Sequence, residues 1–129
     1  MTALADRLAA VLAEVLAVDA EPDGALTVRH DGTLASLRVV PIAEDLELVS
    51  LTQILAWDLP LTEKLRERAA EQANLSQLGT VTLVEKDAES ADVMLRYNFP
   101  GSGLTDDALR TLVLLVLAKG VDVRDALSA

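Results

Sequence analysis

The feature that most constrains the fold is a two-residue turn, Asp31-Gly32, set between two stretches in which apolar and polar residues alternate. Asp-Gly is a preferred pair for the tight turn of a β-hairpin because both residues tolerate positive φ. With the turn at this position, Val28 lies opposite Ala35. The next apolar pair, Leu26 and Leu37, then falls on the same face. We therefore expect a hairpin with one buried face and one polar face.

The segments on either side of this hairpin differ in how well they are defined. Apolar residues at three- and four-residue spacing predict a helix over residues 2–18, which the polar segment 19–24 ends. Residues 46–57 fit a strand and, over part of their length, also a helix. Their β-branched and aromatic residues favour a strand that contains a bulge, and a partly helical segment stays open as the alternative.

Two further helices are predicted from their capping residues. Thr62 is expected to cap a helix that runs to about Gln77. Along its charged face we expect ion pairs between residues three apart: Glu63–Arg66, Lys64–Glu67 and Arg68–Glu71. Thr105, followed by two acidic residues, is expected to cap a third helix. The pair Lys119-Gly120 predicts the end of that helix, and residues 121–129 are expected either to add a short helix or to fray.

A second hairpin is predicted from the alternation in residues 80–86 and 92–99. The order of elements is then α-β-β-β-α-β-β-α. Antiparallel hairpins with helices between them are typical of α+β proteins rather than of parallel βαβ sheets. We expect residues 1–129 to form a single domain with three helices and an antiparallel sheet of about five strands.

Residues that could carry catalysis or bind metals are scarce. The chain has no cysteine, and His30 is its only histidine, so thiol chemistry and multi-histidine metal sites are excluded. Gly101 and Gly103 lack the lysine of a phosphate-binding loop. Three acidic clusters occur in turns or at a helix start: Glu44-Asp45-Glu47, Asp87-Glu89-Asp92 and Asp106-Asp107. None matches a calcium-binding loop, so we expect no enzymatic activity, no metal and no cofactor.

The balance of charge bears on partners and on compartment. The formal net charge is −10, which disfavours binding to nucleic acid and to anionic membranes. The longest apolar run, residues 112–118, is too short to span a membrane, and the N-terminal segment lacks the unbroken apolar stretch of a secretory signal. The absence of cysteine fits a reducing compartment. We expect a soluble, cytoplasmic protein.

A possible surface for a partner or for dimerisation comes from four residues: Trp57, Leu65, Ala69 and Ala73. Tryptophan is enriched in protein interfaces, although a lone tryptophan is more often part of the core. The other three form a thin apolar stripe on the second helix, where small residues allow close approach to a neighbour. The third helix is apolar almost all round over residues 112–117, which indicates burial on more than one side.

The chain also resembles a known family. The residues that carry the resemblance are the segment Leu104–Leu109 after a strand that ends at Phe99-Pro100, and the segment Leu65–Gly79, in which Asn74 precedes a glycine and a new strand. With the order of elements, these are similar to the YbjN-like family over about residues 22–127. That family has been labelled a sensory transduction regulator.

The resemblance implies the fold of type III secretion chaperones, which are homodimers that hold an extended segment of a client protein. The resulting hypothesis is a non-enzymatic, chaperone-like, homodimeric protein-binding module. Its expected partners are a second copy of itself and an extended or unfolded protein segment. The alternative is a domain that binds a small molecule or regulates signalling.

Overall fold

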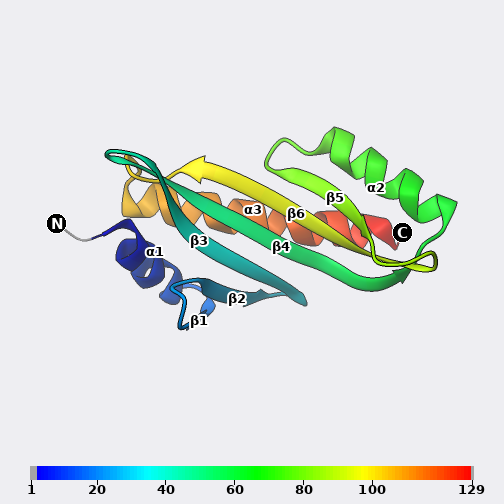
Figure 1. The fold of residues 1–129 in the computed structure, drawn as a ribbon, viewed down its shortest axis with the longest axis horizontal. Coiled ribbons are helices and arrows are strands. Elements are labelled where there is room, and N and C mark those ends of the chain that lie inside the picture. Colours follow the sequence, from blue (N-terminus) through cyan, green and yellow to red (C-terminus); the bar gives the residue numbers. More distant parts are fainter. Residues whose placement is uncertain (1–2, 129) are drawn as a thin grey trace.

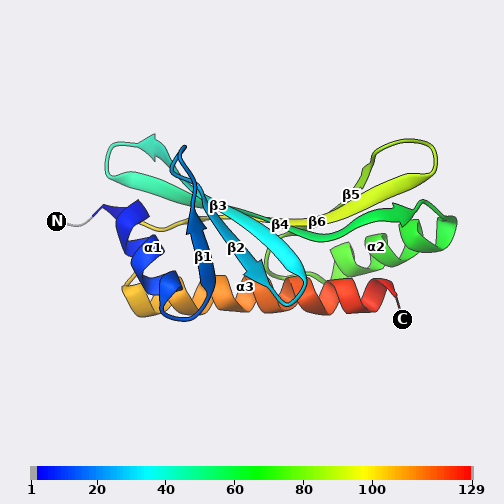
Figure 2. The ribbon, with the colours of Figure 1, turned by 90° about the horizontal axis from the view of Figure 1, so that it is seen from below.

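The computed structural model describes residues 3–128, and it consists of one antiparallel sheet with helices on a single face (Figures 1 and 2). The sheet has six strands in the order β1-β2-β3-β4-β6-β5. In chain order the elements are α1 (Leu4–Ala13), β1 (Ala17–Ala20), β2 (Leu26–His30), β3 (Thr33–Ala43), β4 (Leu46–Pro60), α2 (Glu63–Leu75), β5 (Thr80–Glu85), β6 (Ser90–Pro100) and α3 (Asp106–Leu127). The predicted α+β class is confirmed.

The β2–β3 hairpin has the predicted register. Val28 pairs with Ala35 and Leu26 pairs with Leu37. Asp31 and Gly32 both have positive φ, 46° and 79°, as a tight hairpin turn of this kind requires. Local turn chemistry and side-chain alternation therefore determine this part of the sheet.

The predicted helix over residues 2–18 is too long, and the predicted number of strands is one too few. α1 ends at Ala13, and Ala17–Ala20 forms β1 at the edge of the sheet. Val18 pairs with Val28, while Asp19 forms an ion pair with Arg29 on the neighbouring strand. Pairing with β2 thus overrides the apolar periodicity that continued past the helix.

β4 confirms the prediction of a bulged strand, and the partly helical alternative is wrong. Its pairing with β6 is irregular between Ile54 and Ala56 and again between Ala56 and Leu59. Asp58, within the second irregularity, has a φ of 53°. The bulges bend the strand at the end that leads into α2.

The third helix does not end at Lys119-Gly120 as predicted. α3 continues to Leu127, and Gly120 is buried inside it where the helix crosses β4. The caps at the other ends are as predicted: the Thr62 hydroxyl accepts a hydrogen bond from the backbone N–H of Leu65, and the Thr105 hydroxyl accepts one from Ala108.

The core lies between the sheet and the helices. α1 and α2 both lie alongside α3 on the same face of the sheet, as Figure 2 shows. Alternate residues of β2, of the first half of β3, of the middle of β4 and of the first half of β6 are buried against them, whereas β5 has one buried residue, Val81. The fully buried large side chains are Leu8, Leu12, Val28, Leu37, Val49, Leu51, Gln53, Leu55, Val93, Leu95, Leu109 and Leu117.

Candidate functional site

The four residues predicted as a partner surface do not share one exposed surface. Leu65 and Ala69 are buried in the core of the chain itself. Trp57 is 44% exposed, so the interpretation of this residue as core is wrong. Ala73 is exposed on α2. Trp57 and Ala73 are therefore accessible to a partner, whereas Leu65 and Ala69 are not.

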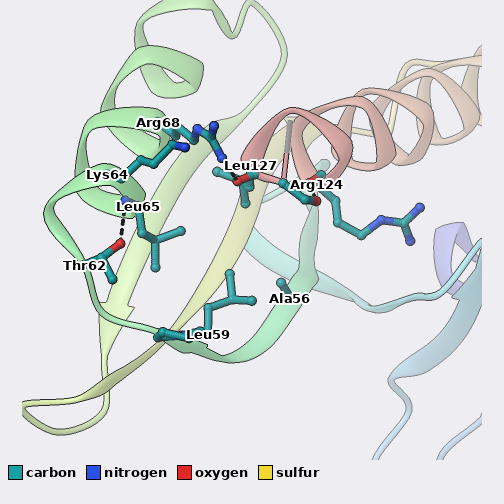
Figure 3. Close-up of a pocket in the computed structure, with 10 residues that line it drawn as sticks. Ala56, Leu59, Thr62, Lys64, Leu65, Arg68, Arg124 and Leu127 are labelled. Atoms are coloured by element: carbon teal, nitrogen blue, oxygen red, sulfur yellow. Dashed lines mark hydrogen bonds between the residues drawn. The ribbon is translucent and has the colours of Figure 1, made fainter.

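A cavity of about 470 Å³ lies between α2, the last turn of α3 and the end of β4 (Figure 3). Apolar side chains line its floor: Ala56, Leu59, Leu65 and Leu127. Pro60, Thr62, Lys64, Arg68, Arg124 and Ser128 complete the lining. The cavity exists because α2 begins directly after the bulged end of β4 and then turns back beside α3.

Two cations of α2 lie at this cavity. Lys64 and Arg68 are four residues apart, so they lie on the same side of the helix, and in Figure 3 their side chains run alongside each other toward Leu127. Arg68 donates a hydrogen bond from Nη1 to the Leu127 carbonyl oxygen at 2.9 Å. The guanidinium of Arg124 turns away from the cavity and donates to the carbonyl of Asp31 and to the carboxylate of Asp125.

The ion pairs predicted along α2 are absent from the described part of the chain. Glu63–Arg66, Lys64–Glu67 and Arg68–Glu71 do not form there, and Arg66 instead pairs with Glu85 on β5 at 2.8 Å. Tertiary geometry places a closer carboxylate beside Arg66 than its own helix offers. Lys64 and Arg68 line the cavity, and neither forms an ion pair with a carboxylate of residues 3–128.

This pair stands out in an acidic chain. Of the eleven lysines and arginines, seven form ion pairs within residues 3–128: Arg7, Arg29, Arg38, Arg66, Lys86, Arg110 and Arg124. The other four are Lys64, Arg68, Arg96 and Lys119. Two of these four line the same apolar cavity. The cavity therefore combines an apolar floor with a cationic mouth.

A second candidate site is an apolar cluster at the tip of the β3–β4 hairpin, which we call the hairpin-tip cluster: Val40, Ile42 and Leu46. These side chains are 38%, 56% and 38% exposed. The tip curls away from the helices at the end of the sheet where α1 lies (Figure 2). Within residues 3–128, four other large apolar side chains are as exposed: Val15, Trp57, Leu75 and Leu115.

The face of the sheet opposite the helices is uncovered in this chain (Figure 2). Across it, Leu34 pairs with Ile54 and Ile54 pairs with Met94, which sets three half-buried apolar side chains in one row over β3, β4 and β6. Thr82 of β5 continues the row opposite Met94. The remaining residues of this face are mostly polar.

Neither candidate site follows from a sequence motif. Two features could have indicated them. Val39 to Ala43 is a run of apolar residues without alternation, which is unusual beside a turn that faces water. Lys64 and Arg68 are cations four residues apart, a spacing that places like charges together on a helix.

One acidic cluster has a structural role in the β5–β6 turn. The Asp87 carboxylate accepts hydrogen bonds from the backbone N–H groups of Glu89 and Ser90, both at 2.8 Å, and from the Ser90 hydroxyl at 3.1 Å. These donors, with the Glu89 N–H contributing most, lower the pKa of Asp87 below its usual value. The Oδ1 atom of this carboxylate is therefore engaged by the turn itself.

A neighbouring group of charges holds the bulge of β4. Lys86 donates to the Asp58 carboxylate at 2.5 Å, and this hydrogen bond raises the pKa of Lys86. The Asp92 carboxylate accepts from the backbone N–H of Asp58 at 2.9 Å. Among residues 3–128, no group of three or more His, Asp or Glu side chains is arranged to hold a metal ion.

His30 and the third acidic cluster also have structural surroundings. His30 is half-buried at the end of β2, and its carbonyl accepts a hydrogen bond from the Thr33 hydroxyl. Asp106 pairs with Arg7 of α1, and Asp107 pairs with Arg110 one turn along α3.

None of the helices in the described part of the chain is both long enough and apolar enough to cross a membrane.

Comparison of the chain with protein-family models, with curated proteins and with solved structures gives no match in any of the three.

Proposed function

We propose that this chain is a non-enzymatic protein-binding module that forms a homodimer through the hairpin-tip cluster. The observation that carries this proposal is the exposure of Val40, Ile42 and Leu46 together at one tip. Single exposed apolar residues are normal on a protein surface, whereas a group of them on one hairpin tip favours an interaction site. A two-fold arrangement would pack the same three side chains of each copy against each other.

The proposal includes an extended client segment, for which the uncovered face of the sheet offers a place. Leu34, Ile54 and Met94 form an apolar row flanked by polar residues. Such a row offers an apolar strip to the side chains of an extended segment, and the hydroxyls of Ser36 and Thr52 lie in the neighbouring pair of the sheet. This is the chaperone-like part of the proposed function.

We also propose that the chain is a YbjN-like protein with the fold of the secretion chaperones. The order of helices and strands supports this relation, apart from the added strand β1. The net charge of −10 supports a function without nucleic acid or anionic membrane as partner. The absence of cysteine supports a cytoplasmic site of action.

Light scattering after size-exclusion chromatography tests the dimer directly. At high micromolar concentration we expect a mass of two chains, twice 13.7 kDa. The double variant Ile42→Asp/Leu46→Asp should have the mass of one chain, because two copies would bury four like charges without partners. The matched control is Leu75→Asp, since Leu75 is 67% exposed and lies on α2, outside the cluster. That control should stay dimeric.

Two results count against the proposal. A single-chain mass for the unmodified protein at every concentration rejects self-association. A dimer that survives Ile42→Asp/Leu46→Asp but dissociates with Leu75→Asp would move the interface to α2.

A domain that binds a small molecule is the second candidate function. The observation that favours it is the cavity between α2 and α3, whose volume of about 470 Å³ lies within the usual range for ligand sites. An apolar floor and a few convergent polar groups are typical of such sites. The two candidate functions use different parts of the molecule and can be tested separately.

A further inference from the structure

We infer that the cavity between α2 and α3 binds a small monocarboxylate with an apolar chain, such as a medium-chain fatty acid. This inference rests on the second candidate function, binding of a small molecule, and specifies its ligand class. The alkyl chain would occupy the apolar floor, and the carboxylate would lie between Lys64 and Arg68 (Figure 3).

The floor of the cavity selects for an apolar chain. Leu59, Leu65 and Leu127 come from three different elements, β4, α2 and α3, and line the same space. Thr62 adds a hydroxyl, but its oxygen already accepts the backbone N–H of Leu65 at the start of α2. Transfer of methylene groups from water to this floor is favourable, because methylenes have no polar atoms that would lose a hydrogen-bond partner.

The mouth of the cavity selects for an anion. Lys64 and Arg68 are like charges four residues apart, which repel each other unless a negative group lies between them. The Leu127 carbonyl uses one of the five N–H donors of Arg68, so the guanidinium retains donors for a carboxylate. Hydrogen bonds between a guanidinium or ammonium and a carboxylate are among the strongest in proteins.

The same surroundings disfavour a peptide as the occupant. A peptide would bring backbone N–H and C=O groups into the cavity, and each needs a hydrogen-bond partner when it leaves water. The floor residues Ala56, Leu59 and Leu65 offer no side-chain donor or acceptor. A fatty acid has its only polar group at one end, which matches a cavity whose cations lie at its mouth.

Calorimetric titration with sodium octanoate tests the inference. We expect saturable binding to one site per chain, with affinity rising about fourfold for each added methylene until the cavity is filled. Lys64→Met and Arg68→Met keep the apolar stems and remove the charges, and each should weaken binding about tenfold to a hundredfold. The matched control is Lys119→Met, because Lys119 also lacks an ionic partner within residues 3–128 but lies outside this cavity. Its affinity should be unchanged.

Folding is separated from binding by the choice of variants. Arg68→Met removes a hydrogen bond to the end of α3, so its helical content and thermal midpoint are compared with those of the parent chain. Lys64 makes no hydrogen bond with residues 3–128, so loss of binding in Lys64→Met reports the charge alone. Equal octanoate affinity in Lys64→Met, Arg68→Met and the parent chain overturns the inference.

Two further measurements distinguish the ligand class from the site. Titration with octan-1-ol, which lacks the charge, tests the ligand class, and NMR shifts of the Leu65 and Leu127 methyl groups test the site. If octan-1-ol shifts these methyls as strongly as octanoate, the cavity binds small molecules but the inferred anion class is wrong. If neither ligand shifts them, both the inference and the second candidate function fail. Binding of a peptide through its free C-terminal carboxylate, with no octanoate binding, would assign the cavity to a protein partner and overturn the inference. None of these outcomes changes the light-scattering result at the hairpin tip.

Discussion

Gly120 of α3 lies directly against Gln53 of β4, so close that a Cβ atom at position 120 would be 2.0 Å from the Gln53 Oε1 atom. Gln53 is fully buried, and its Nε2 donates to the Thr33 hydroxyl at 2.9 Å and to the Leu117 carbonyl at 3.2 Å. One amide thus links the β2–β3 hairpin, β4 and α3. The missing side chain at position 120 is what lets the helix lie on this amide.

Gly120→Ala should therefore destabilise the protein even though alanine favours helices. The added methyl overlaps a buried side chain that is surrounded by other core atoms, and overpacking of this kind costs about 1–3 kcal/mol. Urea unfolding followed by circular dichroism measures the change in the free energy of unfolding.

The control for this prediction is the same substitution in a Gln53→Ala background. There the amide is gone, and the helix propensity of alanine over glycine, about 1 kcal/mol, should make Gly120→Ala neutral or stabilising. An equal loss in both backgrounds would show that contact with Gln53 is not the reason for the glycine.

Two glycines, Gly32 and Gly120, show which parts of the fold can be predicted from the sequence and which cannot. Asp31-Gly32 specifies its hairpin through its own conformational preferences, so the register of β2 and β3 could be predicted without tertiary information. Lys119-Gly120 has the composition of a helix end. Its role depends instead on Gln53, a residue distant in sequence, so no local pattern distinguishes the two uses of glycine.

The site residues show a similar division. Thr62 caps α2 as predicted because capping depends on the next three residues alone. The predicted ion pair between Glu63 and Arg66 is wrong because Arg66 pairs instead with Glu85 on β5, a contact that the sequence of α2 alone does not contain. The exposure of Trp57 depends on which face of a bulged strand it occupies, and the bulges follow from pairing with β6.

Gly79 offers a second test of a backbone constraint. Its φ is 84°, and a Cβ there would lie 2.8 Å from the Arg96 carbonyl oxygen. Gly79→Ala should cost about 1–3 kcal/mol, because it combines backbone strain with a contact to main chain that cannot move aside. Gly24→Ala is the matched control, since Gly24 has a φ of 91° but open space around it. Its smaller loss in thermal unfolding would measure the strain alone, and equal losses would contradict the role of the contact.

Asp87 gives the β5–β6 turn a defined dependence on pH. Its pKa is lower in the folded chain than in the unfolded chain, because the N–H groups of Glu89 and Ser90 favour the carboxylate. The stabilisation is therefore present above the unfolded pKa and is lost as the pH falls through the folded pKa. Asp87→Ala should lower the thermal midpoint at neutral pH, and the difference from the parent chain should shrink as the solution is acidified below the ordinary carboxylate range.

The control for Asp87 lies in the same turn. Glu89 is exposed, and its side chain makes no hydrogen bond with residues 3–128, while its backbone N–H serves Asp87. Glu89→Ala should therefore leave the thermal midpoint and its pH dependence close to those of the parent chain. A pH dependence that Asp87→Ala does not alter would assign the acid sensitivity to other carboxylates.

Trp57 can report which end of β4 lies in the dimer interface. Because this side chain is 44% exposed, acrylamide should quench its fluorescence efficiently in the native chain, whereas a core tryptophan would be protected. Trp57 and Leu46 lie at opposite ends of β4, so quenching of Trp57 should stay constant over the concentrations at which the mass doubles. In the matched variant Trp57→Phe/Ile42→Trp, the single tryptophan is in the hairpin-tip cluster, and its quenching should fall as the dimer forms. Protection of Trp57 itself at high concentration would instead place the interface at the α2 end of the strand.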